Sequence, residues 1–408
     1  MMTTMITVTT MLMKTMAAPG AEVGRTSVRL GVGVWPRGGL KFALLFGGLV
    51  LVGIVCGPVS RSQAAVPLVT AEGFAVPQPG KVFSFPRDHG SHPEFKLEWW
   101  YVTGHLYAID GRRFGFQATF FRQAAPDRSV QLHLAHMAVF DAATGKFYHQ
   151  ERLNRAGWDA GSSVETLDVK QGNWSLRLSD PAAGAGAERI ELRGGVRAEA
   201  ALALTLVPAK PLVIFGENSV SRKGAAPTAA SYYLTFSRLK AEGELTLGEE
   251  KFAVTGEAWM DHEISSSQLD KNQVGWDWVS VQFTDGRELM MYRLRTREGG
   301  ADPASTLTWV DAKSATQKKP FGWEVLDTWK SAATGAVYPS RVAITTTDPA
   351  TGAAVRYTIE PLAREQELVG SLGGISYWEG ACRVRDASGR EVGSGFMELT
   401  GYAAELKL

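Results

Sequence analysis

One short run in the second half of this 408-residue chain combines aromatic, acidic and basic side chains: Trp259, Asp261, His262 and Glu263. A carboxyl group donates a proton near pH 7 only where burial in an apolar surrounding has raised its pKa. We therefore expect Asp261 or Glu263 to act as a general acid. His262 or His133 would be its proton partner. The alternative is a structural role, in which the run caps a turn and pairs across strands.

The backbone decides which of these side chains can act together. If the run is a strand, Asp261 and Glu263 share one face and His262 takes the other. If the strand ends at Asp261, all three could line a rim.

A second group of residues follows the acidic run and is aromatic and partly cationic. Trp276, Trp278 and Gln282 precede an Asp-Gly turn, and Arg293 lies on the return strand. Such a face would bind an elongated apolar molecule with a polar end, although Arg293 over Trp278 could equally be a plain cation–π contact. A similar tryptophan pair stands near residue 100. The predicted substrate-binding residues are Glu98, Trp99, Trp100, Trp259, Trp276, Trp278, Gln282 and Arg293.

The sequence carries no signature of a metal or a cofactor, and we predict neither. His262 and Glu263 do not begin a His-Glu-x-x-His motif, because Ser266 stands where the second histidine would be. His133 and His136 point to opposite faces of a predicted strand, so they do not form a metal pair. Phosphate loops, dinucleotide fingerprints and Gly-x-Ser-x-Gly elbows are absent from the sequence.

The elements that must position these residues are predicted to be antiparallel strands. From Val66 onward, short stretches alternate apolar and polar residues between Gly, Asp-Gly, Asp-Pro and Thr-Gly turns. Two strong hairpins are predicted around Asp-Gly turns. If both turns have two residues, Trp99 faces Arg122 in the first hairpin and Trp278 faces Arg293 in the second. The predicted fold is all-β and mostly without helices.

The two hairpins also suggest how the chain is divided. The first has one aromatic face and one face that mixes Glu98 and Gln117 with aromatics, which indicates a barrel with a polar-lined interior. The second repeats the tryptophan pair, a following valine and Asp-Gly-Arg. We interpret this as a diverged duplication, with a chance recurrence of common hairpins as the alternative. The predicted domains are residues 65–245 and 246–408.

Charge and composition limit the partners. The net charge is +1 and lysines and arginines are spread along the chain, so no nucleic-acid partner is indicated. The chain has 12 tryptophans, which indicates a large core, a ligand cavity or both, because large aromatics are costly to leave exposed. We expect an apolar small molecule or lipid as the partner, with an envelope protein as an alternative partner.

The first 64 residues are predicted to be a signal peptide with an N-terminal extension. An apolar run of about 14 residues, Phe42–Val55, is too short for a comfortable membrane span. The small residues Ser62 and Ala64 then form a cleavage signal. We predict export to the periplasm or the outside with cleavage near Ala64, and a membrane anchor formed by residues 42–56 as the alternative. Cleavage would leave Cys382 without a disulfide partner.

Longer motifs resemble a known family. The segment that starts at Phe85 and reads Phe-Pro-Arg-Asp-His-Gly-Ser-His-Pro-Glu-Phe-Lys-Leu-Glu-Trp-Trp-Tyr-Val-Thr-Gly closely resembles the AttH-like family, and the segments 258–263, 275–283, 377–380 and 395–402 fit it too. This family is related to hydroxyneurosporene synthase, a carotenoid 1,2-hydratase. The resemblance implies two lipocalin-like β-barrels packed together and an apolar ligand, and it points to the exported branch described as secreted hydrolases.

Three functions remain open at this point. The first is an exported enzyme that hydrates or hydrolyses an apolar lipid- or terpenoid-like substrate, and it needs an acidic group inside a cavity. Hydration would require a strong acid in a dry pocket and aromatic faces that stabilise a cation. The second is a non-catalytic lipid carrier or chaperone, which predicts a deep lumen without a buried carboxylate. The third is an envelope scaffold, which predicts a closed core and an exposed apolar patch.

Overall fold

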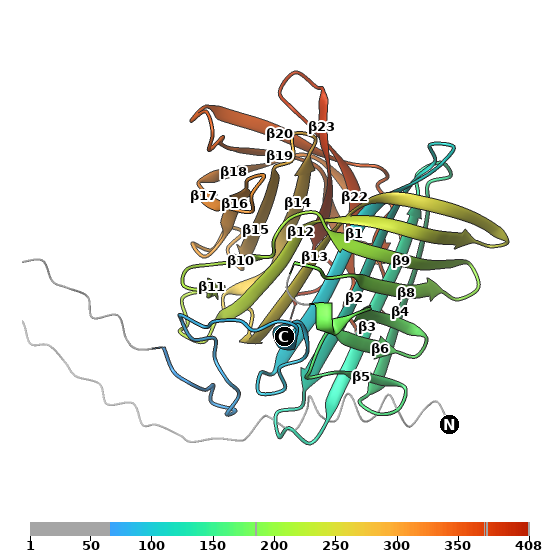
Figure 1. The fold of residues 1–408 in the computed structure, drawn as a ribbon. Helices are drawn as coiled ribbons and strands as arrows, with labels where there is room; N and C mark the ends of the chain where they lie inside the picture. Colours follow the sequence, from blue (N-terminus) through green and yellow to red (C-terminus); the bar gives the residue numbers. More distant parts are fainter. Residues whose placement is uncertain (1–65, 184–185, 371, 373, 407–408) are drawn as a thin grey trace, which may run out of the picture. The chain divides into compact units, whose positions relative to one another are not determined.

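The computed structural model describes residues 66–183, 186–370, 372 and 374–406. The predicted signal peptide and the alternative anchor at residues 42–56 lie outside these residues. Within the described part, the chain forms strands and two short 3-10 helices, η1 (Arg87–His89) and η2 (Pro181–Ala183). None of its helices is long and apolar enough to cross a membrane. The all-β prediction is confirmed, and the strands form two antiparallel sheets (Figure 1).

The first sheet has 13 strands, and its order is β4-β3-β2-β1-β13-β12-β9-β8-β7-β6-β5, with β10 and β11 also paired to β12. Its strands are β1 (Leu97–Ala108), β2 (Arg113–Ala124), β3 (Gln131–Asp141), β4 (Lys146–Arg155), β5 (Ala160–Ser162), β6 (Asp168–Gln171), β7 (Trp174–Leu178), β8 (Ile190–Val196), β9 (Ala200–Pro208), β10 (Val213–Phe215), β11 (Ser221–Arg222), β12 (Ala230–Leu247) and β13 (Glu250–Ser267).

The second sheet has 10 strands in the order β17-β16-β15-β14-β23-β22-β20-β19-β18, with β21 paired to β22. Its strands, orange and red in Figure 1, are β14 (Gln273–Phe283), β15 (Glu288–Thr296), β16 (Thr306–Val310), β17 (Thr316–Lys319), β18 (Phe321–Lys330), β19 (Val337–Thr347), β20 (Ala354–Pro361), β21 (Glu367–Leu368), β22 (Tyr377–Arg385) and β23 (Glu391–Leu399).

Both sheets follow the same plan. In each, the first long strand pairs on one side with its hairpin partner and on the other side with the last strand of the sheet, β1 with β13 and β14 with β23. The sheets curve into two lipocalin-like barrels that pack together. The division predicted at residues 245 and 246 falls within β12, and membership changes from the first sheet to the second only between β13 and β14.

The register of both hairpins differs by one residue from the two-residue turns that the sequence suggested. The Ala108 amide bonds the Arg112 carbonyl at 2.9 Å, which leaves a three-residue loop that ends in Gly111 at φ +85°. A loop of this length places its last residue in the left-handed region, where glycine is favoured. Trp99 therefore faces Phe121 rather than Arg122.

The second hairpin makes the same change. The Phe283 amide bonds the Arg287 carbonyl at 2.9 Å, and Gly286 has φ +84°. Trp278 consequently faces Tyr292, not Arg293.

Side chains on the two faces of β1 have different surroundings. On β1, Trp100, Val102 and Leu106 point into the apolar core of the first barrel. Tyr101 points the other way and packs in one cluster with Trp278 of the second sheet. The interior face of this hairpin is therefore apolar along most of its length, with the polar residues Glu98 and Arg122 at one end, and the face of Trp99 and Tyr101 turns toward the second barrel. A polar lining along the whole barrel interior, as expected, is not found for this hairpin.

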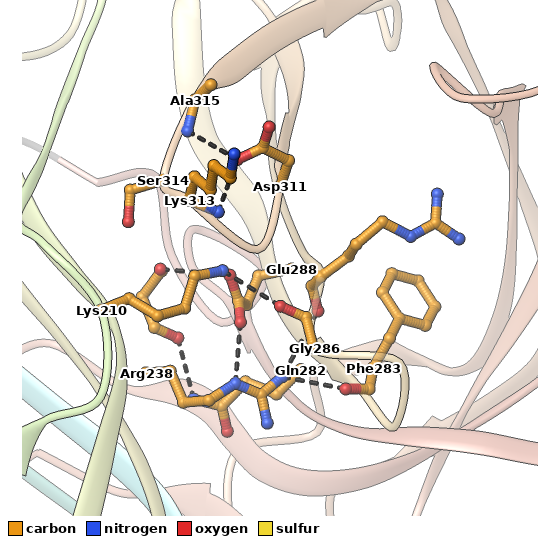
Figure 2. A network of polar contacts seen from close by, with 12 residues as sticks. Lys210, Arg238, Gln282, Phe283, Gly286, Glu288, Asp311, Lys313, Ser314 and Ala315 are labelled. Atoms are coloured by element: carbon orange, nitrogen blue, oxygen red, sulfur yellow. Dashed lines mark hydrogen bonds and ion pairs between the residues drawn. The ribbon is translucent and has the colours of Figure 1, made fainter.

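A buried ionic cluster joins the two sheets near the β14–β15 loop, as Figure 2 shows. Glu288 of β15 is fully buried and forms ion pairs with Lys210 and with Arg238 of β12, the latter at 2.8 Å from Nε. Arg238 also donates from Nη2 to the Phe283 carbonyl at 2.9 Å, and Lys210 donates to the Gly286 carbonyl at 3.1 Å. This cluster fixes the loop of the second sheet against the first.

Candidate functional site

A cavity of about 100 Å³ lies where the outer face of the first sheet meets the second sheet. Its wall is largely aromatic and comes from β1, β12 and β14: Trp99, Tyr101, Tyr233, Trp276 and Trp278. Three carboxyl groups also line it: Asp261, Glu263 and Glu398. Acidic groups in an aromatic cavity are the arrangement that the sequence suggested, and the cavity lies between the barrels rather than within one.

Asp261 of β13 is the most completely enclosed of these acids, with 3% exposure. Its Oδ1 accepts hydrogen bonds from Thr235 at 2.5 Å and from the indole of Trp259 at 2.8 Å, and its Oδ2 accepts one from Tyr233 at 2.8 Å. Burial raises the pKa of Asp261 to about 7, the charge of Glu263 adds to this rise, and the three donors oppose it. Asp261 can therefore hold a proton at neutral pH and still become a stabilised carboxylate after giving it up.

Glu398 of β23 lines the same cavity from the second sheet and is partly accessible. Burial raises its pKa to about 8, although a hydrogen bond from Trp276 acts against this. Its cross-strand neighbour Glu379 is buried and accepts a hydrogen bond from Tyr101. Burial and the charge of Glu398 raise the pKa of Glu379 well above its usual value. Burial thus disfavours a negative charge on Glu398 in the cavity wall and on Glu379 behind it.

Glu263 has different surroundings, although it shares the face of Asp261. Its Oε2 lies 2.9 Å from the ammonium of Lys223, and Ser231 donates a hydrogen bond to it. The Lys223 Nζ lies 4.5 Å from the ring centre of Tyr233 and 4.3 Å from that of Tyr292. Burial acts to lower the pKa of Lys223, but the charge and hydrogen bond of Glu263, together with Tyr292 and Asp261, raise it overall. Glu263 is thus placed as the carboxylate of an ion pair rather than as a proton donor.

Three other predicted residues lie on the opposite face of β1 and β13: Glu98, Trp100 and His262. Glu98 is fully buried and accepts hydrogen bonds from His262 Nε2 at 2.8 Å, and Trp100 stacks on the His262 ring with centres 4.8 Å apart. Burial lowers the pKa of His262 to about 4. The alternation of strand side chains, expected for His262, thus separates these residues from the cavity.

Glu98 is the centre of a polar network rather than a free ligand. His92 Nδ1 and His262 Nε2 contact one of its oxygens at 2.9 and 2.8 Å, and Arg122 Nε contacts the other at 3.0 Å. The ligand atoms of His92, Glu98 and His262 lie within 4.8 Å of one another, which would suit a metal ion. Hydrogen bonds and the Arg122 charge already satisfy the Glu98 carboxylate, so the group is explained as a buried ion network.

The remaining predicted residues contact protein groups around the cavity. Trp259 lies behind Asp261 and donates to it. Gln282 donates to the carbonyls of Ser237 and Ala258, both at 2.9 Å, and Arg293 pairs with Asp277 at 2.8 Å. Both are therefore occupied by structural contacts.

The two histidines of β3 point to opposite faces, as predicted. His136 lines the cavity and its Nδ1 lies 2.7 Å from the Tyr377 hydroxyl, whereas His133 is absent from the cavity wall. Burial lowers the pKa of both to about 4.

Sequence reasoning missed several residues of the cavity: Tyr101, His136, Lys223, Tyr233 and Glu398. Glu398 had a signal, because it belongs to the 395–402 segment that carries the family resemblance. Tyr101 shares the strand face of Trp99. Lys223 lies in an irregular stretch, and no local pattern in the sequence connects it with Glu263.

The fold and cavity define a class of protein, namely paired lipocalin-like barrels with an acidic, aromatic cavity between them. Within that class, the chain belongs to the AttH-like family, whose model matches residues 76–402. This confirms the resemblance seen in the motifs.

Solved structures share this fold. A candidate AttH protein from Nitrosomonas europaea is 37% identical, with 81% of this chain and 100% of that chain covered and a TM-score of 0.72. Kievitone hydratase from Nectria haematococca is 15% identical, with 81% and 98% covered and a TM-score of 0.62. CghA with Sch210972 is 13% identical, with 83% and 99% covered and a TM-score of 0.51. The last two show a common fold only. The comparison with curated proteins gave no match.

Proposed function

We propose that this protein is an enzyme that adds water to a carbon–carbon double bond of an apolar, lipid- or terpenoid-like substrate. The observation that carries this proposal is Asp261, a buried carboxyl group that faces an aromatic cavity and accepts three hydrogen bonds. Burial keeps the proton on Asp261 in the resting state, and the three donors stabilise the carboxylate that forms when the proton leaves.

The reaction can be balanced with Asp261 as the only proton donor and acceptor. Its proton passes to one carbon of the double bond, whose π electrons form the new C–H bond and leave a cation on the other carbon. A water oxygen attacks that carbon and forms the C–O bond. The surplus proton on the oxygen then returns to the Asp261 carboxylate, which restores the acid.

The cavity wall supplies the stabilisation that such a cation needs. Trp99, Trp276 and Trp278 present aromatic rings to the cavity, and the faces of aromatic rings attract positive charge. The charges of Lys223 and Glu263 compensate each other at 2.9 Å, so the cavity can accept an apolar substrate. The fold shared with a protein named as a hydratase is in keeping with this reaction.

A non-catalytic lipid carrier is the second candidate, and the aromatic cavity favours it as well. Burying a carboxyl group without need costs free energy, however, and a carrier of apolar molecules has no use for Asp261 and Glu398 in its binding wall. Hydrolysis of a lipid-like substrate would use the same acid. We therefore rank hydration or hydrolysis above transport.

The test is turnover in heavy water on a panel of prenyl-type alkenes, with mass spectrometry as the readout. We expect products that gain one water and one carbon-bound deuterium, and D261N should lower their rate by about 10²- to 10⁴-fold. D168N makes the same change at an exposed position of β6 and should match the wild type. Undiminished deuterium incorporation by D261N would contradict the role of Asp261.

A further inference from the structure

Four apolar side chains form a row across the cavity-side face of the first sheet. Trp99 of β1 pairs with Phe121 of β2, Phe121 with Leu134 of β3, and Leu134 with Leu153 of β4. Cross-strand partners lie on the same face of a sheet, so these side chains are consecutive neighbours. With strands about 4.8 Å apart, the row is roughly 14 Å long.

The row leads from the cavity to the protein surface. Trp99 and Phe121 line the cavity and are half-buried, Leu134 is half-buried outside it, and Leu153 is 39% exposed. Asp261, in contrast, is 3% exposed. The row therefore begins at the partly open side of the cavity and ends at solvent.

Mostly polar residues border the row. On one side, Gln123 of β2 and Arg155 of β4 flank Leu132 of β3, which is 36% exposed. On the other side, Glu151 is the next residue of β4 on the same face. A strip one to two side chains wide with mostly polar borders suits a single hydrocarbon chain better than a protein surface, which needs a broader patch.

The size of the cavity gives an independent reason for such a strip. Its volume of about 100 Å³ is small beside the roughly 300–1,000 Å³ of pockets that enclose whole ligands. A long apolar substrate with its double bond at Asp261 must therefore extend beyond the cavity.

We propose that the row Trp99, Phe121, Leu134 and Leu153, which we call the apolar track, binds the distal hydrocarbon chain of the substrate. This proposal rests on the proposed function and specifies it, because the substrate is then an elongated chain rather than a compact ring system. The reacting end lies in the cavity and the remainder follows the track across β2 and β3 to β4.

The experiment measures binding of a homologous series of linear alcohols, from about six to about eighteen carbons, by quenching of tryptophan fluorescence. A chain half-covered by the track buries about half of each methylene, so wild-type affinity should rise about twofold per added carbon. L153Q and L134Q/L153Q should bind the short alcohols as the wild type does and lose this gain for the long ones. L153Q changes an already exposed residue and so preserves the fold.

The matched control is V325Q/V337Q, which removes two similarly exposed apolar side chains, at 44% and 50%, from β18 and β19 of the second sheet. It should keep the full dependence on chain length. Circular dichroism and thermal unfolding verify that all variants are folded.

The outcomes separate the two proposals. If short alcohols bind but affinity does not rise with length, or if L134Q/L153Q keeps the rise, the apolar track is refuted and the cavity remains a binding site. If no alcohol of any length binds, the cavity ligand and with it the track are refuted. If the variants lose binding only to phospholipid vesicles, the row is a membrane contact and the proposal is wrong.

Discussion

Two opposed effects act on the pKa of the Asp261 carboxyl group. Removal from water raises its pKa, and three hydrogen-bond donors lower it. The neighbouring Glu263 lies on the same face of the strand, but its Oε2 is 2.9 Å from the Lys223 ammonium, with which it forms an ion pair. Two acids in one strand thus receive different roles from their surroundings alone.

The raised pKa of Asp261 predicts how the stability of the fold depends on pH. The folded chain holds a proton at Asp261 up to about pH 7, whereas the unfolded chain releases it near pH 4. The stabilisation from this proton is complete below about pH 4 and is lost as the pH rises through about 7. Relative to D261N, which does not titrate, the wild type should lose up to about 4 kcal/mol over this range.

Urea unfolding of both proteins at about pH 4 and about pH 8 measures this difference. D168N, altered at the surface, should follow the wild type. Parallel pH dependences of D261N and the wild type would mean that Asp261 is ionised throughout.

For single residues, the sequence predicted which residue types belong to the site better than it predicted which face of a strand each side chain occupies. The predicted residues Asp261, Glu263, Trp99, Trp276 and Trp278 line the cavity, whereas His262 lies on the opposite face of its strand. Glu98 was placed on the face of Trp100, as in the structure, but the three-residue turn moves Gln117 and Phe121 to the face of Trp99, and an Asp-Gly pair fits both loop lengths. Lys223 meets Glu263 only through the tertiary fold, which no local pattern encodes.

Among the elements, the β14–β15 loop depends on charges supplied by the other barrel. Glu288 is fully buried between Lys210 and Arg238. These two side chains also donate hydrogen bonds to backbone carbonyls of the loop (Figure 2). Glu288 thus ties the loop end of the β14–β15 hairpin to β12 of the first sheet.

Loss of the Glu288 charge should therefore weaken the joint between the barrels. E288Q removes the ion-pair partner of Lys210 and leaves Arg238 with Glu257 alone, and breaking a buried pair costs about 3–5 kcal/mol. We expect a lower urea midpoint and faster amide hydrogen exchange at residues 283–288. E244Q removes a surface pair with Lys251, 50% and 67% exposed, and should cost less than about 1 kcal/mol. Unchanged exchange in E288Q would show that apolar packing alone holds the loop.

The strands themselves were largely predictable, because alternation of apolar and polar residues and Asp-Gly turns are short-range signals. The pairing of β1 with β13 was not, since Leu97 and Ser265 are far apart in the chain and share no motif. The predicted division at residue 245 likewise assigned β13 to the second half, although it completes the first sheet.

For the whole molecule, the repeated strand order supports the duplication inferred from the two hairpins. Each sheet is a lipocalin-like unit, and the cavity exists only because two such units meet. A single unit would have the acid of β13 without the tryptophans of β14.

Export of the whole chain remains a prediction, and the mature N-terminus tests it. Cleavage near Ala64 should yield a protein that starts close to Ala65 and is released with the soluble contents of the envelope. N-terminal sequencing and intact mass of the protein from its native host provide the measurement. A chain that keeps residues 42–56 and fractionates with membranes would favour the anchor instead.

The pairing of first and last strands has a consequence for how the protein is made. Neither sheet is complete until its final strand has left the ribosome, and contacts between distant residues form slowly. A chain cut short before β23 would leave β14 with a bare edge, and bare edges recruit other chains into aggregates. Premature termination before β23 is therefore more damaging than the short length of the lost segment would suggest.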